Sequence, residues 1–359
     1  MDLETVSALL QHPGPYLTAY VDVTRDTADA EHRIELAWRS ARERVSRDGA
    51  PDGLTDLVEG HVLRPTSAPG RVNRMVVAAH GDVLLDEEVR QTDPADVVTW
   101  GPLPDVTSWL SDRDMMIPVL LVIADREGAD IEYYDGWPGY PTDEDSIHGE
   151  TLHIKKVPAG GWAHKQYQRR TEEVWRRNAD EVATEIDHRA RGGVPLIALT
   201  GDVRAVGEIR EALSEPAASK VVVLEDGSRA EGSSREMLDD AVDQAVRDTV
   251  IEEHLHSVRE IEEGTGQRGD AVHGLPEVIE NLVQGRVRTL ALAPRIAAQR
   301  EVAPAEYPGL PLPEQALEHA RLRADLVAVC AAAATDADLV ILGAASLPQD
   351  GIAALLRWS

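Results

Sequence analysis

The spacing of apolar and polar residues in the first third of the chain predicts strands and helices in turn. Leu17 to Val23 alternates and is rich in β-branched residues, as expected of a strand. Ile34, Trp38 and Ala41 then recur on one face of a helix. The elements expected here are a strand over 17–23, helices over 28–45 and 54–63, and a hairpin of 74–80 with 83–85.

The middle third begins with a nearly continuous apolar run, Pro118 to Asp125, which is typical of a buried strand. We expect it to form a hairpin with 129–134, followed by a loop over 137–145 that is rich in Pro, Gly and acids. A long helix is expected from about Thr171 to just before Gly192. The further elements expected are strands over 152–154, 196–200 and 221–224 and a helix over 206–213.

The last third opens with a predicted helix, at about 237–261, whose exposed face is acidic. The elements expected after it are helices over 275–283 and from 314 to about 334, and strands over 287–292 and 339–343. Because strands and helices alternate, parallel pairing within α/β layers is favoured. We therefore expect an α/β fold with mixed sheets, in three domains over residues 1–114, 115–235 and 236–359.

One stretch of the middle domain differs in charge from the rest of the chain. The formal net charge is -28, yet residues 153–170 hold five Lys or Arg, two His and no acid. Pro158 and the Gly160-Gly161 pair permit tight backbone geometry, so residues 155–170 are expected to form an irregular loop on the start of the long helix. A solvated surface excursion is the plainest interpretation of such a charge run.

The side chains of this loop favour a second interpretation. Trp162 and Tyr167 are costly to leave in water unless they stack on something. A basic tip with aromatic residues, on an acidic body, suits entry into a phosphate-lined pocket. The candidate RNA-binding residues are Lys155, Lys156, Gly160, Gly161, Trp162, His164, Lys165, Gln166, Tyr167, Gln168, Arg169 and Arg170.

The order of a strand, a Gly-Gly loop and a long helix resembles the central domain of the eukaryotic and archaeal class I release factors and their relative Pelota. The chain is more similar to a bacterial branch of that family, which includes the hibernation factor Balon and a mycobacterial dormancy-associated protein. The segments that carry the resemblance are Gly14 to Asp22, Ala124 to Asp130, Gly160-Gly161-Trp162 with Thr171-Glu172-Glu173, and Leu355 to Arg357.

The resemblance implies a three-domain, release-factor-like architecture. It also implies binding to the ribosomal A site, with the Gly160-Gly161 loop against ribosomal RNA of the peptidyl transferase centre, and delivery by elongation factor Tu. In release factors the corresponding first domain reads stop codons, but its motifs are not found in this chain. The resemblance therefore points to a cytoplasmic factor in ribosome hibernation, during dormancy or stress.

The residue after Gly-Gly departs from the release-factor pattern. Release factors place Gln there to help water reach the ester of peptidyl-tRNA, whereas this chain has Trp162. This departure argues against an enzyme. The alternative is a peptidyl-tRNA hydrolase in release or rescue that uses Gln166 or Gln168. A third interpretation is an α/β module whose basic loop binds a protein partner.

Composition limits the other classes of function. The N-terminus lacks a signal-peptide pattern, and no apolar run approaches membrane-spanning length. The single cysteine, Cys330, lies in an apolar stretch and is expected to be buried, which fits a reducing cytoplasm. The net charge argues against broad nucleic-acid binding and against anionic membranes.

No motif predicts a metal or a cofactor. Gly264 to Gly269 fits G-x-G-x-x-G but follows an acidic helix rather than a strand, so we interpret it as a helix stop and linker. Asp125 and His80 are interpreted as turn residues. His254 and His256 are two positions apart on one predicted helix and so face different sides. We expect no metal and no cofactor.

Overall fold

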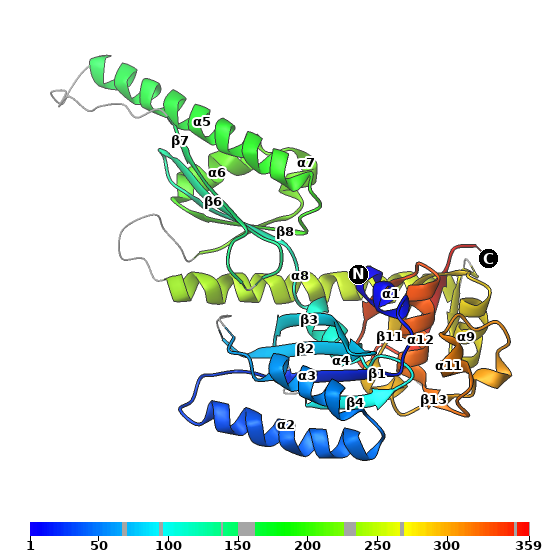
Figure 1. Ribbon diagram of the computed structural model, residues 1–359. Coiled ribbons are helices and arrows are strands. Elements are labelled where there is room, and N and C mark those ends of the chain that lie inside the picture. The colour runs from blue at the N-terminus through cyan, green and yellow to red at the C-terminus, as the bar shows by residue number, and fades with distance from the viewer. Residues whose placement is uncertain are drawn as a thin grey trace. The chain divides into compact units, whose positions relative to one another are not determined.

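The structure is a computed structural model that describes residues 1–66, 70–92, 96–137, 139–149, 162–225, 235–265, 269–347 and 350–358, without the side chains of 162–171. Contacts divide the chain into two compact units (Figure 1). Unit 1 consists of residues 1–115 and 252–359, and unit 2 of residues 116–251. Unit 1 therefore holds the first predicted domain and most of the third.

The first sheet of unit 1 is antiparallel, with the strand order β3-β2-β1-β4. Its strands are β1 (Tyr16–Asp22), β2 (Val72–Ala79), β3 (Asp82–Arg90) and β4 (Val97–Gly101). The predicted hairpin is confirmed, since Ala79 pairs with Asp82. His80 occupies its turn with a φ of 51°, and His80 Nε2 lies 3.0 Å from the carbonyl oxygen of Gly14.

Two helices, α2 (Ala30–Arg47) and α3 (Asp52–Val62), share a core with this sheet. On α2 the buried residues are Ala30, Ile34, Trp38, Ala41 and Val45, the spacing of one helix face, which confirms the predicted helix. Two shorter helices complete this part, α1 (Glu4–Leu10) and α4 (Thr107–Asp114). The side chains shared by the helices and the sheet include Leu17, Val21, Leu54, Val58, Val62, Val76 and Val98.

The second sheet of unit 1 is mixed, with the order β10-β15-β11-β14. Its strands are β10 (Ala271–His273), β11 (Val287–Leu292), β14 (Asp338–Ile341) and β15 (Ile352–Leu356). The predicted strands β11 and β14 pair in parallel. Strand β15, which sequence reasoning missed, lies between β10 and β11 and pairs antiparallel to both. The predicted helix over 275–283 is confirmed as α9 (Leu275–Val283).

The helix expected from 314 to about 334 is wrong in its first half. Only α11 (Glu314–Leu317) and α12 (Ala324–Ala334) are helical, and between them β13 (Leu322–Arg323) pairs with β12 (Glu301–Val302). Arg323 donates at 2.5 Å both to Asp325 and to Asp105, which are buried. Strand pairing and this ion-pair cluster outweigh local helix propensity. Two short turns precede it, α10 (Pro294–Ala297) and a 3₁₀ helix (Pro304–Glu306).

Unit 2 is built on one mixed sheet with the order β7-β6-β5-β8-β9. Its strands are β5 (Val119–Ala124), β6 (Gly128–Tyr134), β7 (Asp143–His148), β8 (Leu196–Gly201) and β9 (Val221–Val223). The predicted hairpin of β5 with β6 is confirmed, and β5, β8 and β9 pair in parallel as expected.

One prediction in this sheet is wrong and another falls outside the described residues. The loop expected over 137–145 ends early, because Asp143 to Asp145 already belong to β7, which pairs with β6. Acidic, exposed residues suit an edge strand, where charge discourages pairing with other chains. The strand expected over 152–154 lies outside the described residues.

Helices α5 (Trp162–Ala190), α6 (Val203–Ala212) and α7 (Glu215–Ala218) complete this core of unit 2. Buried side chains of α5 and α6, including Val182, Ile186 and Ile209, join strand residues such as Leu120 and Leu199. Figure 1 shows the start of α5 reaching past the ends of the strands of its own sheet. Among the described side chains of α5, those packed in this core lie between Val174 and Ala190.

Helix α8 (Arg235–Glu263) runs through the boundary between the units at Ile251. Within unit 2 its start is fixed to β6, because Arg235 donates to both carboxylate oxygens of Glu132 at 2.9 Å. Trp137 Nε1 donates to Asp243 at 2.6 Å. The predicted helix over about 237–261 is therefore confirmed.

These elements confirm an α/β fold with mixed sheets and with a long helix after the Gly-Gly segment. In the described part of the chain, no helix has both the length and the apolar character that crossing a membrane requires.

Candidate functional site

The predicted RNA-binding segment falls partly on α5. That helix begins at Trp162, nine residues before the expected start at Thr171, so the expected loop over 155–170 is too long. The residues from Trp162 to Arg170 include no Gly or Pro, and Ala, Lys, Gln and Arg are good helix formers. Lys155, Lys156, Gly160 and Gly161 lie outside the described residues. Of Trp162, His164, Lys165, Gln166, Tyr167, Gln168, Arg169 and Arg170, the structure describes the backbone alone.

Charge is distributed unevenly along α5. Residues 162–170 contain three Lys or Arg and no acid, whereas residues 171–190 contain three Arg and six acids. The first turn of the helix holds no acidic residue. Acidic residues favour the start of a helix because of its dipole, and basic residues disfavour it. The start of α5 is therefore a place where backbone N–H groups and cations all favour an anion.

The second half of α5 is the anchored part. Among its described side chains, burial begins at Val174 and continues through Asn178, Val182 and Ile186, at the spacing of one helix face. Glu172 and Glu173, just before Val174, are exposed. Val174 lies about 18 Å along the helix axis from Trp162, at 1.5 Å per residue.

The turn between β5 and β6 holds α5 and α6 together. Its Arg126 guanidinium donates to both carboxylate oxygens of Asp202, at 3.2 and 3.0 Å. The same guanidinium lies over the ring of Trp175 on α5, with 4.6 Å from Arg126 Cζ to the ring centroid. Asp202 in turn caps α6 by accepting from the backbone N–H groups of Arg204 and Ala205. Burial opposes the effect, but the bonds from Arg126 and these N–H groups lower the pKa of Asp202.

The same turn also holds the end of β7. The carbonyl oxygen of Glu127 accepts from the backbone N–H of Gly149 at 2.7 Å. The carbonyl oxygen of Arg126 accepts from Asn178 Nδ2 of α5 at 3.0 Å. A Cβ on Gly149 would lie 2.2 Å from the Asn178 carboxamide, so only glycine permits this approach. One turn thus contacts both the point where β7 ends, before residues 150–161, and the helix that follows them.

A cavity of about 460 Å³ opens beside this turn, between one face of α5 and one face of α6. Acidic and basic side chains mix in its lining, which is Asp125, Arg126, Glu172, Trp175, Arg176, Ala179, Arg204, Ala205, Gly207, Glu208 and Glu211. Arg176 and Glu208 pair across it at 3.5 Å. A Cβ added to Gly207 would meet no atom within 4 Å, so packing inside the chain does not require glycine there.

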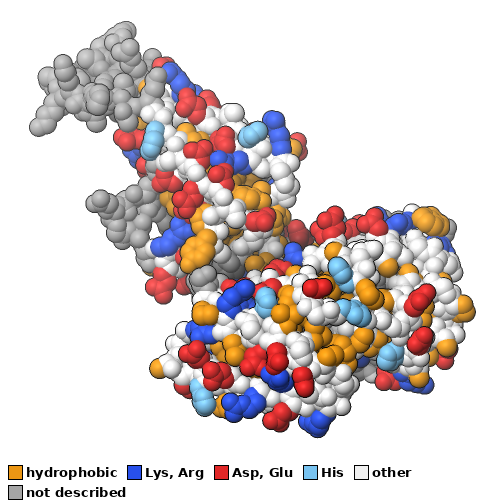
Figure 2. Space-filling model, in the orientation of Figure 1, with side chains coloured by type: hydrophobic (Ala, Val, Ile, Leu, Met, Phe, Trp, Pro, Cys, Tyr) orange, Lys and Arg blue, Asp and Glu red, His pale blue; other side chains and the backbone are white. Residues whose placement is uncertain are grey.

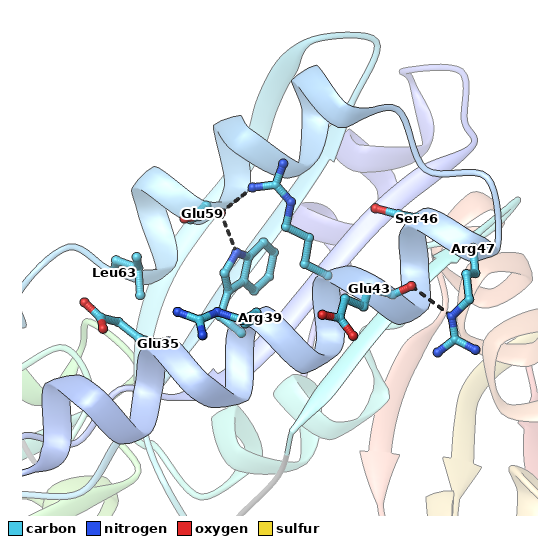
Figure 3. Close-up of a pocket in the computed structure, with 9 residues that line it drawn as sticks. Glu35, Arg39, Glu43, Ser46, Arg47, Glu59 and Leu63 are labelled. Atoms are coloured by element: carbon cyan, nitrogen blue, oxygen red, sulfur yellow. Dashed lines mark hydrogen bonds and ion pairs between the residues drawn. The ribbon is translucent and has the colours of Figure 1, made fainter.

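A second cavity of about 780 Å³ lies between α2 and α3 in unit 1 (Figure 3). Trp38 Nε1 donates to Glu59 at 3.0 Å, and Arg42 donates to the same carboxylate at 2.6 Å. Its lining contains three Arg and three Glu, so its charge favours neither an anion nor a cation.

Residues considered as ligands or catalytic groups have structural partners. Asp125 Oδ1 accepts from the backbone N–H groups of Glu127 and Gly128, which confirms it as a turn residue. His254 Nε2 lies 2.6 Å from Asp114. Cys330 is buried as expected, and burial raises the pKa of its thiol. No group of three or more His, Cys, Asp or Glu among the described residues is placed to hold a metal ion.

Sequence reasoning missed the residues at the base of the site. Arg126 lies in the turn of the predicted hairpin, where the sequence gives no sign of a special role. Its partners Trp175 and Asp202 lie 49 and 76 positions further along the chain. One signal in the sequence could have indicated this contact. Trp175 is an aromatic residue among charged residues of α5, outside the helix face of Val174, Val182 and Ile186.

Two proteins of Mycobacterium tuberculosis are similar to the chain over their length. An uncharacterized protein of Mycobacterium tuberculosis H37Rv, Rv2629, is 29% identical over 373 aligned positions, which cover 100% of this chain and 97% of that protein. Its counterpart in strain CDC 1551, MT2704, gives the same figures. Among solved structures, Dom34 of S. cerevisiae is 10% identical with a TM-score of 0.43, covering 82% of this chain and 83% of its own.

Pelota of Archaeoglobus fulgidus is 16% identical with a TM-score of 0.38, covering 80% of this chain and 84% of its own. A family model matches the region that contains α5 and the turn beside it. Residues 118–267, which contain the sheet of unit 2, α5, α6 and α8, match the sequence profile of Bacterial archaeo-eukaryotic release factor family 2. Through this segment the chain is similar to the bacterial members of the archaeo-eukaryotic release factor family.

Proposed function

We propose that this chain is a ribosome-binding hibernation factor. In this proposal it occupies the ribosomal A site, with the Gly160-Gly161 segment and the start of α5 against RNA of the peptidyl transferase centre. The observation that carries the proposal is the charge of α5, which is purely basic over 162–170, where the helix extends past its sheet. The family match over 118–267 supports the same assignment.

Electrostatics explains why such a tip would be selective. RNA offers a dense line of phosphates, which Lys and Arg neutralise while releasing counterions. The remainder of the protein is strongly acidic, and Figure 2 shows acidic side chains over the described surface of both units. An acidic body is repelled from RNA at large, so only the basic end of α5 would approach it closely. Trp162 and Tyr167 would then stack on bases.

Hydrolysis of peptidyl-tRNA remains the alternative, and the helix start bears on it. Gln166 and Gln168 follow Gly161 by five and seven positions and lie within α5, rather than directly after the Gly-Gly pair. We therefore propose binding without catalysis. Delivery by elongation factor Tu is part of the proposal only through the resemblance.

The test is charge reversal at the start of α5. In the triple variant Lys165→Glu, Arg169→Glu and Arg170→Glu, we expect the dissociation constant for empty 70S ribosomes to rise about 100-fold or more. The slope of log affinity against log salt concentration should fall by the equivalent of about 2 to 3 phosphate contacts. Co-sedimentation over a range of salt concentrations measures both quantities.

The matched control changes the net charge equally at other exposed positions. Arg210→Glu with Arg247→Glu and Arg259→Glu should retain most of the affinity, since these residues lie on α6 and α8. Equal loss in both triple variants, or in neither, would contradict the proposal. Release of peptide from loaded ribosomes that disappears in Gln166→Ala or Gln168→Ala would favour the hydrolase instead.

A further inference from the structure

Function at the start of α5 depends on where that helix points. Trp162 lies about 20 Å from Trp175 along the helix axis. A tilt of roughly 10° at Trp175 would therefore displace the start of α5 by ~3 to 4 Å, as much as a whole hydrogen-bond length. The contacts of Trp175 therefore bear on where the start of α5 lies.

The contacts around Trp175 converge on Arg126. Its guanidinium donates twice to the Asp202 carboxylate, and its Cζ lies over the Trp175 ring. Its backbone carbonyl holds Asn178, one helical turn further along α5. We name Arg126, Trp175, Asn178 and Asp202 the clamp.

We infer that the clamp aims α5, and that Arg126 is a positioning residue for binding through the basic start of that helix; this inference rests on the proposed function. The two contacts of Arg126, with a carboxylate and with an aromatic ring, require a planar cation. A guanidinium can donate in parallel to a carboxylate while one face stacks on an aromatic ring, whereas a lysine ammonium can do neither.

The Arg126 side chain is not part of the buried core. The Arg126 side chain is 41% exposed, and the buried cluster of unit 2 consists of apolar residues such as Val182, Ile186 and Leu199. An exposed ion pair of this kind contributes little to global stability. Its effect on the direction of a projecting helix is therefore separable from its effect on folding.

The clamp also joins the two sides of the segment that precedes α5. The last described residue before that segment, Gly149, is bonded to Glu127, next to Arg126. Asn178 fits against Gly149 so closely that a Cβ would overlap it. Loss of the clamp would therefore loosen α5 relative to the end of β7.

The experiment compares Arg126→Lys with Arg176→Lys. Both keep the charge, and Arg176 is the control because it pairs singly with Glu208 and is 70% exposed. We expect Arg126→Lys to weaken binding to empty 70S ribosomes about tenfold and Arg176→Lys to leave it within about twofold. Trp175→Leu should weaken binding similarly, and the double variant with Arg126→Lys should add little further.

A distance measurement separates aiming from general damage. Spin labels on Ala163→Cys, in the first turn of α5, and on Val222→Cys, on the exposed edge strand β9, report the direction of the helix. The native Cys330 is fully buried and does not compete for label. We expect Arg126→Lys to shift or widen the distance distribution by about 3 Å or more, with an unchanged urea midpoint.

The outcomes are distinct for the two proposals. If Arg126→Lys binds ribosomes as well as Arg176→Lys does, the inference is overturned while the proposed function stands. Failure of the unaltered chain to bind ribosomes overturns the proposed function. In that case the spin-label distances alone test whether the clamp aims α5. An unchanged distance distribution in Arg126→Lys shows that it does not, and a widened distribution shows that it does.

Discussion

Helices α5 and α8 are equally long, at 29 residues, yet they differ in how charge and burial are distributed. In α8, acids outnumber Lys and Arg by ten to three, and its buried residues are Leu238, Val242, Ala245, Val246, Val250 and Ile261. In α5 the two charges are equal in number but separated along the helix, and burial of the described side chains begins at Val174.

The difference shows what each helix start is built to meet. The charged side chain at the start of α8 has its partners inside the protein, because Arg235 donates to Glu132 and to the hydroxyl of Tyr134. The start of α5 gathers cations at the positive end of a helix dipole, an arrangement that an external anion would stabilise. The first residue of α8 is thus bonded within unit 2, whereas burial of the described side chains of α5 begins at Val174.

The largest expected effect tests which half of α5 carries stability. Ile186 is fully buried in the core of unit 2, so Ile186→Ala should lower the free energy of unfolding by about 3 kcal/mol. Ala163→Gly, in the first turn, should cost less than about 1 kcal/mol. Urea unfolding followed by circular dichroism measures both. A cost at Ala163 as large as that at Ile186 would show that the start of α5 is packed too.

The next effect concerns the start of α8. Arg235→Lys should destabilise the protein by about 1 kcal/mol at pH 7, because lysine cannot bind both oxygens of Glu132. Burial of Glu132 acts in the opposite direction, but the bonds from Arg235 and Tyr134 lower its pKa. The pair therefore stabilises the fold fully above the unfolded value of about 4.3 and loses this contribution as the pH falls through the lower folded value.

The free energy of unfolding, measured from pH 7 to pH 3, tests the pair of Arg235 and Glu132. The unaltered chain should lose more stability than Arg235→Lys below about pH 4, so the two curves should converge in acid. A constant gap between the curves would mean that Glu132 is not the partner that matters.

The smallest effect has the opposite sign. Gly207→Ala on α6 should raise the free energy of unfolding by about 0.5 to 1 kcal/mol, because alanine favours a helix and its Cβ meets no neighbouring atom. Gly149→Ala is the contrasting variant and should destabilise, since its Cβ would overlap Asn178. Differential scanning calorimetry measures the change in stability of both variants. Destabilisation by Gly207→Ala would contradict the open space at Gly207.

Local pattern was sufficient where an element buries one face along its whole length. The stripe of Ile34, Trp38 and Ala41 predicted α2, and the apolar run at 118–125 predicted β5 and its hairpin. The pattern failed where pairing overrode composition. Acid-rich β7 is a strand because it lies along β6, and the helix expected from 314 breaks where β13 pairs with β12.

The sequence by itself determined the alternation of strands and helices and the isolated cluster of cations before Thr171, because periodicity and charge are properties of neighbouring positions. Only the tertiary structure decided what holds that cluster's helix in place. Arg126 meets Asp202 across 76 positions and Asn178 meets the Arg126 carbonyl across 52. Such meetings depend on how parallel strands bring their ends to one edge of a sheet, which no local pattern encodes.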